Sequence, residues 1–118
     1  MPQQWARLAG SSVPLSEVKA ELFKALAHPA RVRVLEVLVD GERSVGELQP
    51  LVGIELSHLS QQLGVLRRAG LVTARKERSS VFYALRDPLV GELLSVAKQL
   101  LLTTLAQTRG LLAAAEAS

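Results

Sequence analysis

The side chains best suited to chemistry lie between residues 55 and 69, where polar residues surround a stripe of leucines. These leucines are spaced by three, four and three residues, which places them on one side of a predicted helix. The other side offers hydroxyl, imidazole, amide and guanidinium groups, which hydrogen-bond to base edges and phosphates, so nucleic acid is a candidate ligand. The members of this polar side are Ser57, His58, Gln61, Gly64, Val65 and Arg68, with Ser60 and Gln62 on its flanks.

The charge around this helix is one-sided. Residues 57–76 contain no Asp or Glu, and residues 55–86 hold six Arg or Lys residues against two Glu. An ordinary surface helix carries both signs, whereas carboxylates would repel phosphates. Strand-like runs at residues 72–76 and 81–85 follow, joined by a short link, and they predict a basic hairpin. We therefore favour a face that binds a polyanion over a merely solvated one.

The rest of the composition argues against other kinds of site. The chain has no cysteine, which excludes disulfides, thiolate metal sites and thiol redox sensing. Its two histidines, His28 and His58, are accompanied by neither a Gly-rich phosphate loop nor clustered carboxylates. Because no nucleophile is paired with a base, the sequence predicts no enzyme, no metal site and no cofactor.

Three further helices are expected before the polar one. The first begins at Ser16 as its N-cap and ends where His28 and Pro29 break it, because the residue before proline avoids the α region. Proline suits the first turn of a new helix, so a second helix starts there. We expect His28 to be a structural residue at this break rather than a sensor.

The third helix is short and has a recognisable start. Ser44 and Glu47 form an S-x-x-E capping box, in which serine accepts from a first-turn amide and glutamate accepts from the cap's own amide. Gly53 is expected to close this helix, which precedes the polar helix by only a few residues.

A last helix begins at Asp87 and Pro88 and is apolar over nearly half of its circumference. A single short domain cannot cover that much apolar surface, and uncovered surface on a terminal helix usually marks a partner, such as a second copy related by two-fold symmetry. The central stripe consists of Val90, Leu94, Ala97, Leu101 and Leu105.

Length and composition predict one domain that is mainly α-helical with a small β-hairpin. The 118 residues are 48% hydrophobic but only 3% aromatic, so Leu, Val and Ala must fill the core. Residues 1–14, which include Trp5, read as a flexible arm, and residues 15–115 read as the domain. Since no secretory signal or apolar run of roughly 18 residues is seen, we expect a soluble cytoplasmic protein without a membrane partner.

Four segments together resemble the ArsR/SmtB family of winged helix-turn-helix repressors. They are LAHPAR at residues 26–31, SVGEL at residues 44–48, LSQQLGVLRRAGLV at residues 59–72 and VFYAL at residues 81–85. The match spans about residues 17–100 in order and spacing, and its wording is especially similar to that of actinobacterial members.

The resemblance implies a homodimer that binds double-stranded operator DNA. The third and fourth helices form the helix-turn-helix, the hairpin is the wing, and the first and last helices form the dimer interface. The reading stretch is matched by Ser57, His58, Ser60, Gln61 and Gln62; Arg68 joins it from the face analysis, and Arg75, Lys76 and Arg78 lie in the wing. The interface residues are Leu22, Val90, Leu94, Ala97, Leu101 and Leu105.

The sequence also departs from the family. Metal-sensing members place cysteines on the third helix, or Asp and His on the last one, and this chain has neither arrangement. The inducing signal and any small-molecule effector therefore stay open. The alternative to a DNA-binding repressor is a winged-helix module that docks a protein through the same polar helix.

Overall fold

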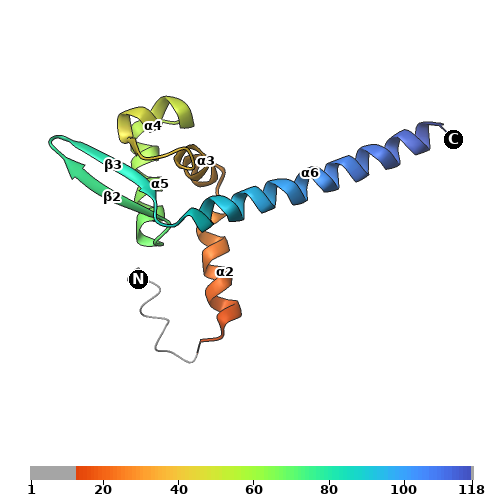
Figure 1. The fold of residues 1–118 in the computed structure, drawn as a ribbon, viewed down its shortest axis with the longest axis horizontal. Coiled ribbons are helices and arrows are strands. Elements are labelled where there is room, and N and C mark those ends of the chain that lie inside the picture. The colour runs from red at the N-terminus through yellow and green to blue at the C-terminus, as the bar shows by residue number, and fades with distance from the viewer. Residues whose placement is uncertain (1–12, 118) are drawn as a thin grey trace.

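The structure, a computed structural model, describes residues 13–117. The arm expected at residues 1–14 lies almost entirely outside the described residues, and so does Trp5. The described part contains five helices and three strands (Figure 1). In chain order they are α2 (Leu15–Leu26), α3 (Pro29–Leu38), β1 (Arg43–Ser44), α4 (Val45–Val52), α5 (Leu56–Arg68), β2 (Val72–Glu77), β3 (Ser80–Leu85) and α6 (Pro88–Ala117).

The core forms where α3, α4 and α5 pack against the base of the hairpin. The leucine stripe of α5 is its centre, because Leu59, Leu63 and Leu66 are each at most 1% exposed. Burying one such leucine contributes about 1.5–3 kcal/mol, so the stripe fixes which side of α5 faces solvent. The other fully buried side chains are Val34, Leu35, Leu48 and Val72.

Local signals set most of the helix boundaries. The Nδ1 atom of His28 accepts a hydrogen bond from the backbone N–H of Ala30 at 3.1 Å, which caps α3 and confirms the structural role predicted for this histidine. The capping box of Ser44 and Glu47 is also confirmed, with bonds of 3.0 and 3.1 Å. The expected cap at the first helix is wrong: α2 begins at Leu15, with no side-chain cap bond.

The hairpin belongs to a three-stranded antiparallel sheet of order β1-β3-β2, so the expectation of a hairpin alone was incomplete. The two residues of β1 pair with the middle of β3, opposite Tyr83 and Phe82. Two residues are too few to leave a strand pattern in a sequence. At the hairpin tip Glu77 pairs with Ser80, and Arg78 adopts a φ of 58° to close the turn.

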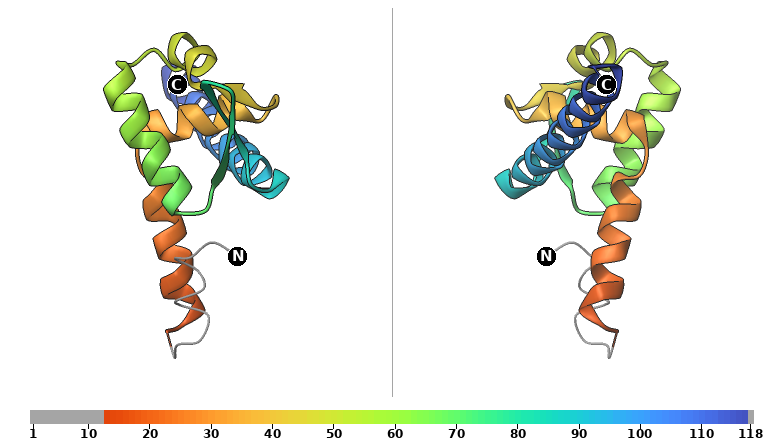
Figure 2. Two further views of the ribbon diagram at one scale, coloured as in Figure 1. Left: turned by 90° about the vertical axis from the view of Figure 1, so that its left-hand side faces the viewer. Right: turned by 90° about the vertical axis from the view of Figure 1, so that its right-hand side faces the viewer.

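Helix α6 projects from the body on the side away from the hairpin (Figures 1 and 2). The radius of gyration is 17.8 Å, whereas a compact chain of this length has about 13.5 Å. By length and composition alone α6 is long and apolar enough to cross a membrane. Its most apolar 18-residue stretch has a mean hydropathy of 1.4, and none of that stretch is buried. One such helix is weak support for a membrane span, but it qualifies the expectation that no apolar run reaches roughly 18 residues.

Candidate nucleic-acid interface

The solvent-facing side of α5 carries the polar residues predicted for it. Ser57, Ser60, Gln61 and Arg68 are exposed, because the opposite side of the helix is locked into the core. Arg67, in the last turn, is exposed as well. Sequence reasoning did not assign Arg67 to this face, although the absence of acid from residues 57–76 was the signal that included it.

Gln62 does not lie on this face. Its side chain is only 7% exposed, on the buried side of α5 between Leu59 and Leu63. The placement on a flank of the polar face is therefore corrected: the helical period puts position 62 at the border of the leucine stripe, and packing against the rest of the body buries it. Gln62 is available to position α5 rather than to read a base.

His58 is half-buried, and its ring packs edge-on against the ring of His28, with 5.7 Å between the centroids. The contact joins the start of α5 to the cap of α3. Since Nδ1 of His28 accepts from an amide, the neutral ring carries its proton on Nε2, where a metal would otherwise bind. In the described residues no group of three His, Asp or Glu side chains gathers as metal ligands.

The hairpin divides its cations into paired and unpaired ones. Arg75 donates to both carboxylate oxygens of Glu42, at 2.8 and 2.6 Å, and to Glu77 at 2.6 Å, while its guanidinium lies 4.7 Å from the Phe82 ring centroid. These contacts raise the pKa of Arg75, through Glu42 first, and lower the pKa of Glu42. Arg75 therefore has to break its ion pairs with Glu42 and Glu77 before it can bind a phosphate.

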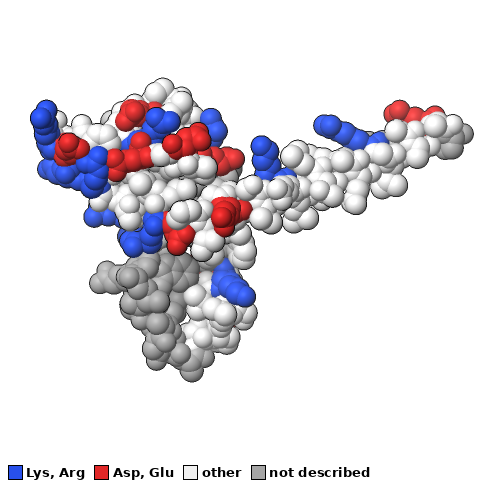
Figure 3. Space-filling model, viewed as in Figure 1, with Lys and Arg blue, Asp and Glu red and all other residues white. Residues whose placement is uncertain are grey.

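Lys76 and Arg78 differ from Arg75 because, within residues 13–117, no ion pair joins either to a carboxylate. Both are exposed toward the tip of the hairpin. Figure 3 shows cationic side chains gathered over the hairpin with acidic ones beside them, whereas the projecting α6 is largely uncharged. Within residues 13–117 the unpaired cations of the hairpin are thus at its tip, while Arg67 and Arg68, which also form no ion pair, lie at the end of α5 just before the hairpin begins.

The residues predicted for self-association lie in two environments. Leu22, Val90 and Leu94 are half-buried against the chain's own core, which leaves less of their surface for a partner. Ala97, Leu101 and Leu105 are exposed. An apolar groove of about 570 Å³ between α2, α3 and α6 contains the last three and Leu94. Its lining also includes residues that sequence reasoning did not assign, namely Phe23, Leu26, Val32, Glu36, Leu93, Lys98 and Leu102.

Comparison with known proteins bears on the same segments. Residues 26–75 match the model of a helix-turn-helix domain family. A protein of Mycobacterium tuberculosis described as an uncharacterized HTH-type transcriptional regulator is 57% identical over 91 residues, which cover 76% of this chain and 80% of that protein. Its crystal structure superposes with a TM-score of 0.74 at 55% identity, over 81% of this chain and 97% of that one.

Two more distant proteins extend the comparison. A biofilm growth-associated repressor of Xylella fastidiosa is 45% identical over 76 residues, which cover 64% of this chain and 67% of the repressor. The solution structure of a homodimeric winged helix-turn-helix DNA-binding domain from Mycobacterium bovis has a TM-score of 0.71 at 29% identity, over 84% of this chain and 94% of that one. The predicted winged helix-turn-helix fold is thereby confirmed.

Proposed function

This chain belongs to the ArsR/SmtB family of winged helix-turn-helix regulators, and from that premise we propose that it is a dimeric, sequence-specific repressor of transcription. In this proposal α5 enters the major groove of a palindromic operator, and the β2–β3 hairpin contacts the flanking backbone or minor groove. Residues 15–115 act as one DNA-binding and dimerisation domain of a cytoplasmic protein. The Xylella relative, described as a repressor, supports repression rather than activation.

The observation that carries the proposal is the exposed side of α5. It offers hydrogen-bonding groups and two arginines without a carboxylate anywhere in residues 57–76, and the hairpin that follows it carries two further cations, Lys76 and Arg78, that form no ion pair within residues 13–117. Phosphates attract such a surface and would be repelled by a mixed one. A rigid helix backed by a packed leucine stripe also holds its side chains in one register, which base reading requires.

The contacts divide into reading and positioning ones. We assign base reading to Ser57, Ser60 and Gln61, because hydroxyl and amide groups distinguish base edges. Arg68, Lys76 and Arg78 are assigned to phosphates or the minor groove, with Arg75 joining them only after release from its carboxylates. His58, packed on His28, contributes mainly by fixing the start of α5.

The test is a titration of duplex from the gene's own promoter region, followed by fluorescence anisotropy at several salt concentrations. Gln61→Ala is expected to cost about 1–3 kcal/mol on the operator and to relax base preference, whereas Arg78→Ala weakens all duplexes alike and flattens the salt dependence. Arg109→Ala, which removes an exposed cation from the far part of α6, is the matched control and should change neither.

Equal affinity of the unmodified protein for operator and scrambled duplex would reject sequence-specific control. If binding has no salt-dependent component at all, the protein-docking alternative gains instead, because phosphate contacts always release counterions.

The dimer is proposed from the apolar groove between α2, α3 and α6. A second copy supplies the same apolar α6, and two-fold symmetry lets each α6 cover the other copy's groove. The homodimeric relative from Mycobacterium bovis supports this occupant over a different protein. Glu36 and Lys98 at the groove offer opposite charges that a symmetric partner can pair.

Sedimentation equilibrium tests the dimer. Leu101→Glu places a charge in the groove and should weaken self-association by roughly a hundredfold or more, since an unpaired buried charge is costly. Leu51→Glu makes the same change at an exposed leucine on α4, outside the groove, and should leave the dimer intact. A monomer at all concentrations, or binding of the unmodified protein to phospholipid vesicles, would overturn the proposal for α6.

A further inference from the structure

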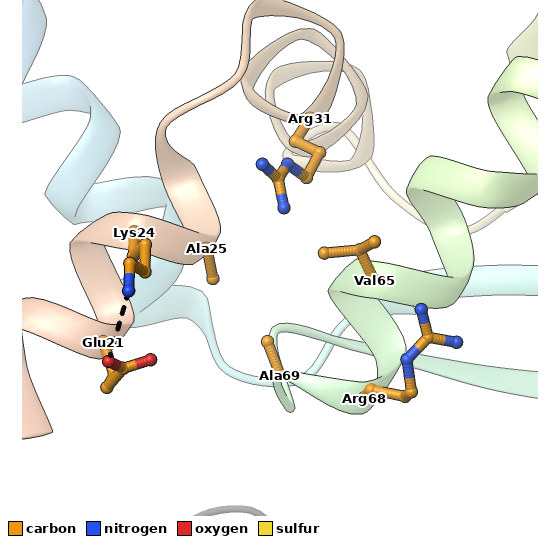
Figure 4. A pocket seen from close by; sticks show the side chains of 7 residues that line it. All are labelled: Glu21, Lys24, Ala25, Arg31, Val65, Arg68 and Ala69. Atoms are coloured by element: carbon orange, nitrogen blue, oxygen red, sulfur yellow. Dashed lines mark ion pairs between the residues drawn. The ribbon is translucent and has the colours of Figure 1, made fainter.

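We propose that a second site, which shares Arg68 with the DNA-facing side of α5, binds a small organic anion between α2, α3 and α5. The site is a pocket of about 280 Å³ at which the three helices meet (Figure 4). Its cations come from all three helices and its remaining surface is mostly small and apolar. The lining residues are Glu21, Lys24, Ala25, Arg31, Val65, Arg68 and Ala69.

The charge in this pocket is unbalanced. Lys24 is paired with Glu21 at 3.7 Å on the surface of α2, so these two largely cancel. Arg31 and Arg68 have no carboxylate partner within residues 13–117. Two guanidinium groups therefore remain at one pocket without a counter-charge, which attracts an anion.

Arg31 supplies the independent sign that something is missing. Its Nε atom is buried and has no hydrogen-bond partner among the described residues. Leaving a buried N–H donor unsatisfied is costly, and within residues 13–117 the other side-chain atom in this state is Nε of Arg43. Figure 4 shows the Arg31 side chain reaching from α3 toward the space between α2 and α5. A carboxylate or phosphate there would accept from the guanidinium in two-pronged fashion.

Gly64 leaves room for the second cation. A Cβ atom at this position would lie 3.1 Å from Nη1 of Arg68, so the guanidinium folds back along α5 over the glycine. A glycine inside a helix costs about 0.5–1 kcal/mol relative to alanine, which calls for a local reason. Space for Arg68 beside Val65 is such a reason.

Size and lining define the class of ligand. The volume is at the low end for small-molecule sites. The side chains of Ala25, Val65 and Ala69 give an apolar floor. Arg31 is directed into the space and can bind the anionic end, whereas the guanidinium of Arg68 lies along α5 and has to turn toward Arg31 to join it (Figure 4). A carboxylate attached to a short apolar body fits this combination, and an inorganic oxyanion satisfies only the charged half.

The position of the pocket gives the ligand a route to DNA binding. It contacts α5 near its C-terminal end and α2, which lines the groove proposed for the second copy. An anion that engages Arg68 withdraws a cation from the DNA-facing side, so ligand and DNA should oppose each other by the same factor in both directions. This regulatory consequence rests on the proposed function, whereas the binding site itself does not.

Binding is tested on the full chain without DNA, by isothermal titration with benzoate and, separately, inorganic phosphate. Benzoate is expected to bind saturably in the micromolar to millimolar range and phosphate more weakly. Arg31→Gln should weaken benzoate at least about tenfold, because it removes charge-assisted hydrogen bonds. Arg33→Gln, an exposed cation on the same helix outside the pocket, should have no effect. Arg31→Lys, which keeps the charge but loses the planar fork, should fall between them.

Thermal melting checks that each variant folds. If Arg31→Gln does not fold, Arg68→Gln replaces it in the binding test. Failure of both anions to saturate, or equal weakening by Arg31→Gln and Arg33→Gln, overturns the site. If the arginines bind a DNA phosphate instead, Arg31→Gln lowers operator affinity while benzoate does not bind, and the site is likewise overturned. Saturable benzoate binding by a protein that does not bind operator would uphold the site and reject the proposed function.

Discussion

Helices α5 and α6 each carry an apolar stripe with steps of three and four residues, yet the two stripes lie in opposite surroundings. Leu59, Leu63 and Leu66 of α5 are sealed inside the body and only Leu56, in its first turn, is exposed, whereas Leu101 in α6 is 62% exposed. Only the first turns of α6 reach the core, through Val90 and Leu94. Spacing predicts that a helix has an apolar side; it does not say whether the same chain or another copy covers it.

The two helices also differ in the polarity and charge of their outer surfaces. The outer side of α5 is polar, free of carboxylates and accompanied by unpaired cations, so it is stable in water and attracts a polyanion. The exposed side of α6 is apolar and is poorly suited to water. One chain thus presents a cationic polar surface, for which we propose DNA, and an apolar surface, for which we propose a second copy, at separate places.

Truncating one leucine in each stripe should give the largest difference between the two helices in the free energy of unfolding. Leu63→Ala leaves a cavity in the core and should lower the free energy of unfolding by about 2–5 kcal/mol at every protein concentration. Leu101→Ala should change the stability of the monomer by no more than about 0.5 kcal/mol and act through self-association alone. Urea unfolding at several protein concentrations distinguishes them. Equal, concentration-independent losses would break the comparison.

The glycines of the two helices offer a matched pair with smaller effects. Nothing lies within 4 Å of a Cβ added at Gly110 in α6, so Gly110→Ala should stabilise that helix by about 0.5–1 kcal/mol and leave DNA affinity unchanged. Gly64→Ala gains the same helix propensity but displaces Arg68, and should weaken operator binding severalfold. Circular dichroism and anisotropy measure the two quantities. Unchanged operator affinity for Gly64→Ala would contradict a role for Arg68.

The hairpin cations provide a finer test, namely which of them contact phosphates of the DNA bound by α5. Arg78→Ala should reduce the slope of log affinity against log salt by about 1, as for one lost phosphate contact. Arg75→Ala should reduce it by less, because Glu42 and Glu77 already neutralise that guanidinium. A larger reduction for Arg75 than for Arg78 would show that DNA displaces the carboxylates.

Of these perturbations, acid acting on the capping box of Glu47 should have the smallest effect on the free energy of unfolding. Hydrogen bonds from the backbone and hydroxyl of Ser44 hold the pKa of Glu47 below its ordinary value of 4.5. Since the folded pKa is lower than the unfolded one, the bond contributes stability above pH 4.5 and loses it as the pH falls through the folded pKa. Glu47→Gln should therefore narrow the difference in unfolding free energy between pH 7 and acid. An unchanged difference would exclude this capping contribution.

Sequence reasoning recovered the elements that local rules dictate. The capping box, the break at His28 and the leucine stripe of α5 each depend on residues within one or two turns of each other. The winged helix-turn-helix order followed from combining them with the basic hairpin. The resemblance carried by residues 59–72 pointed to the same fold.

What sequence reasoning missed depends on contacts between distant segments. The carboxylate that holds Arg75 comes from Glu42, 33 residues away, and β1 exists only because β3 lies beside it. The contact of His58 with His28 likewise joins separate helices. Gln62 was misplaced for the same kind of reason: the helical period puts it at the border of the leucine stripe, and only packing against other parts of the body decides that it is buried.

Photo-crosslinking tests the contrast between α5 and α6 most directly. A photoreactive residue is placed at Gln61 in one variant and at Leu105 in another, and each is irradiated with labelled operator duplex. The account predicts that the Gln61 variant crosslinks to DNA and that the Leu105 variant crosslinks to a second copy of the chain. Crosslinks from Gln61 to protein, or from Leu105 to DNA, would contradict it.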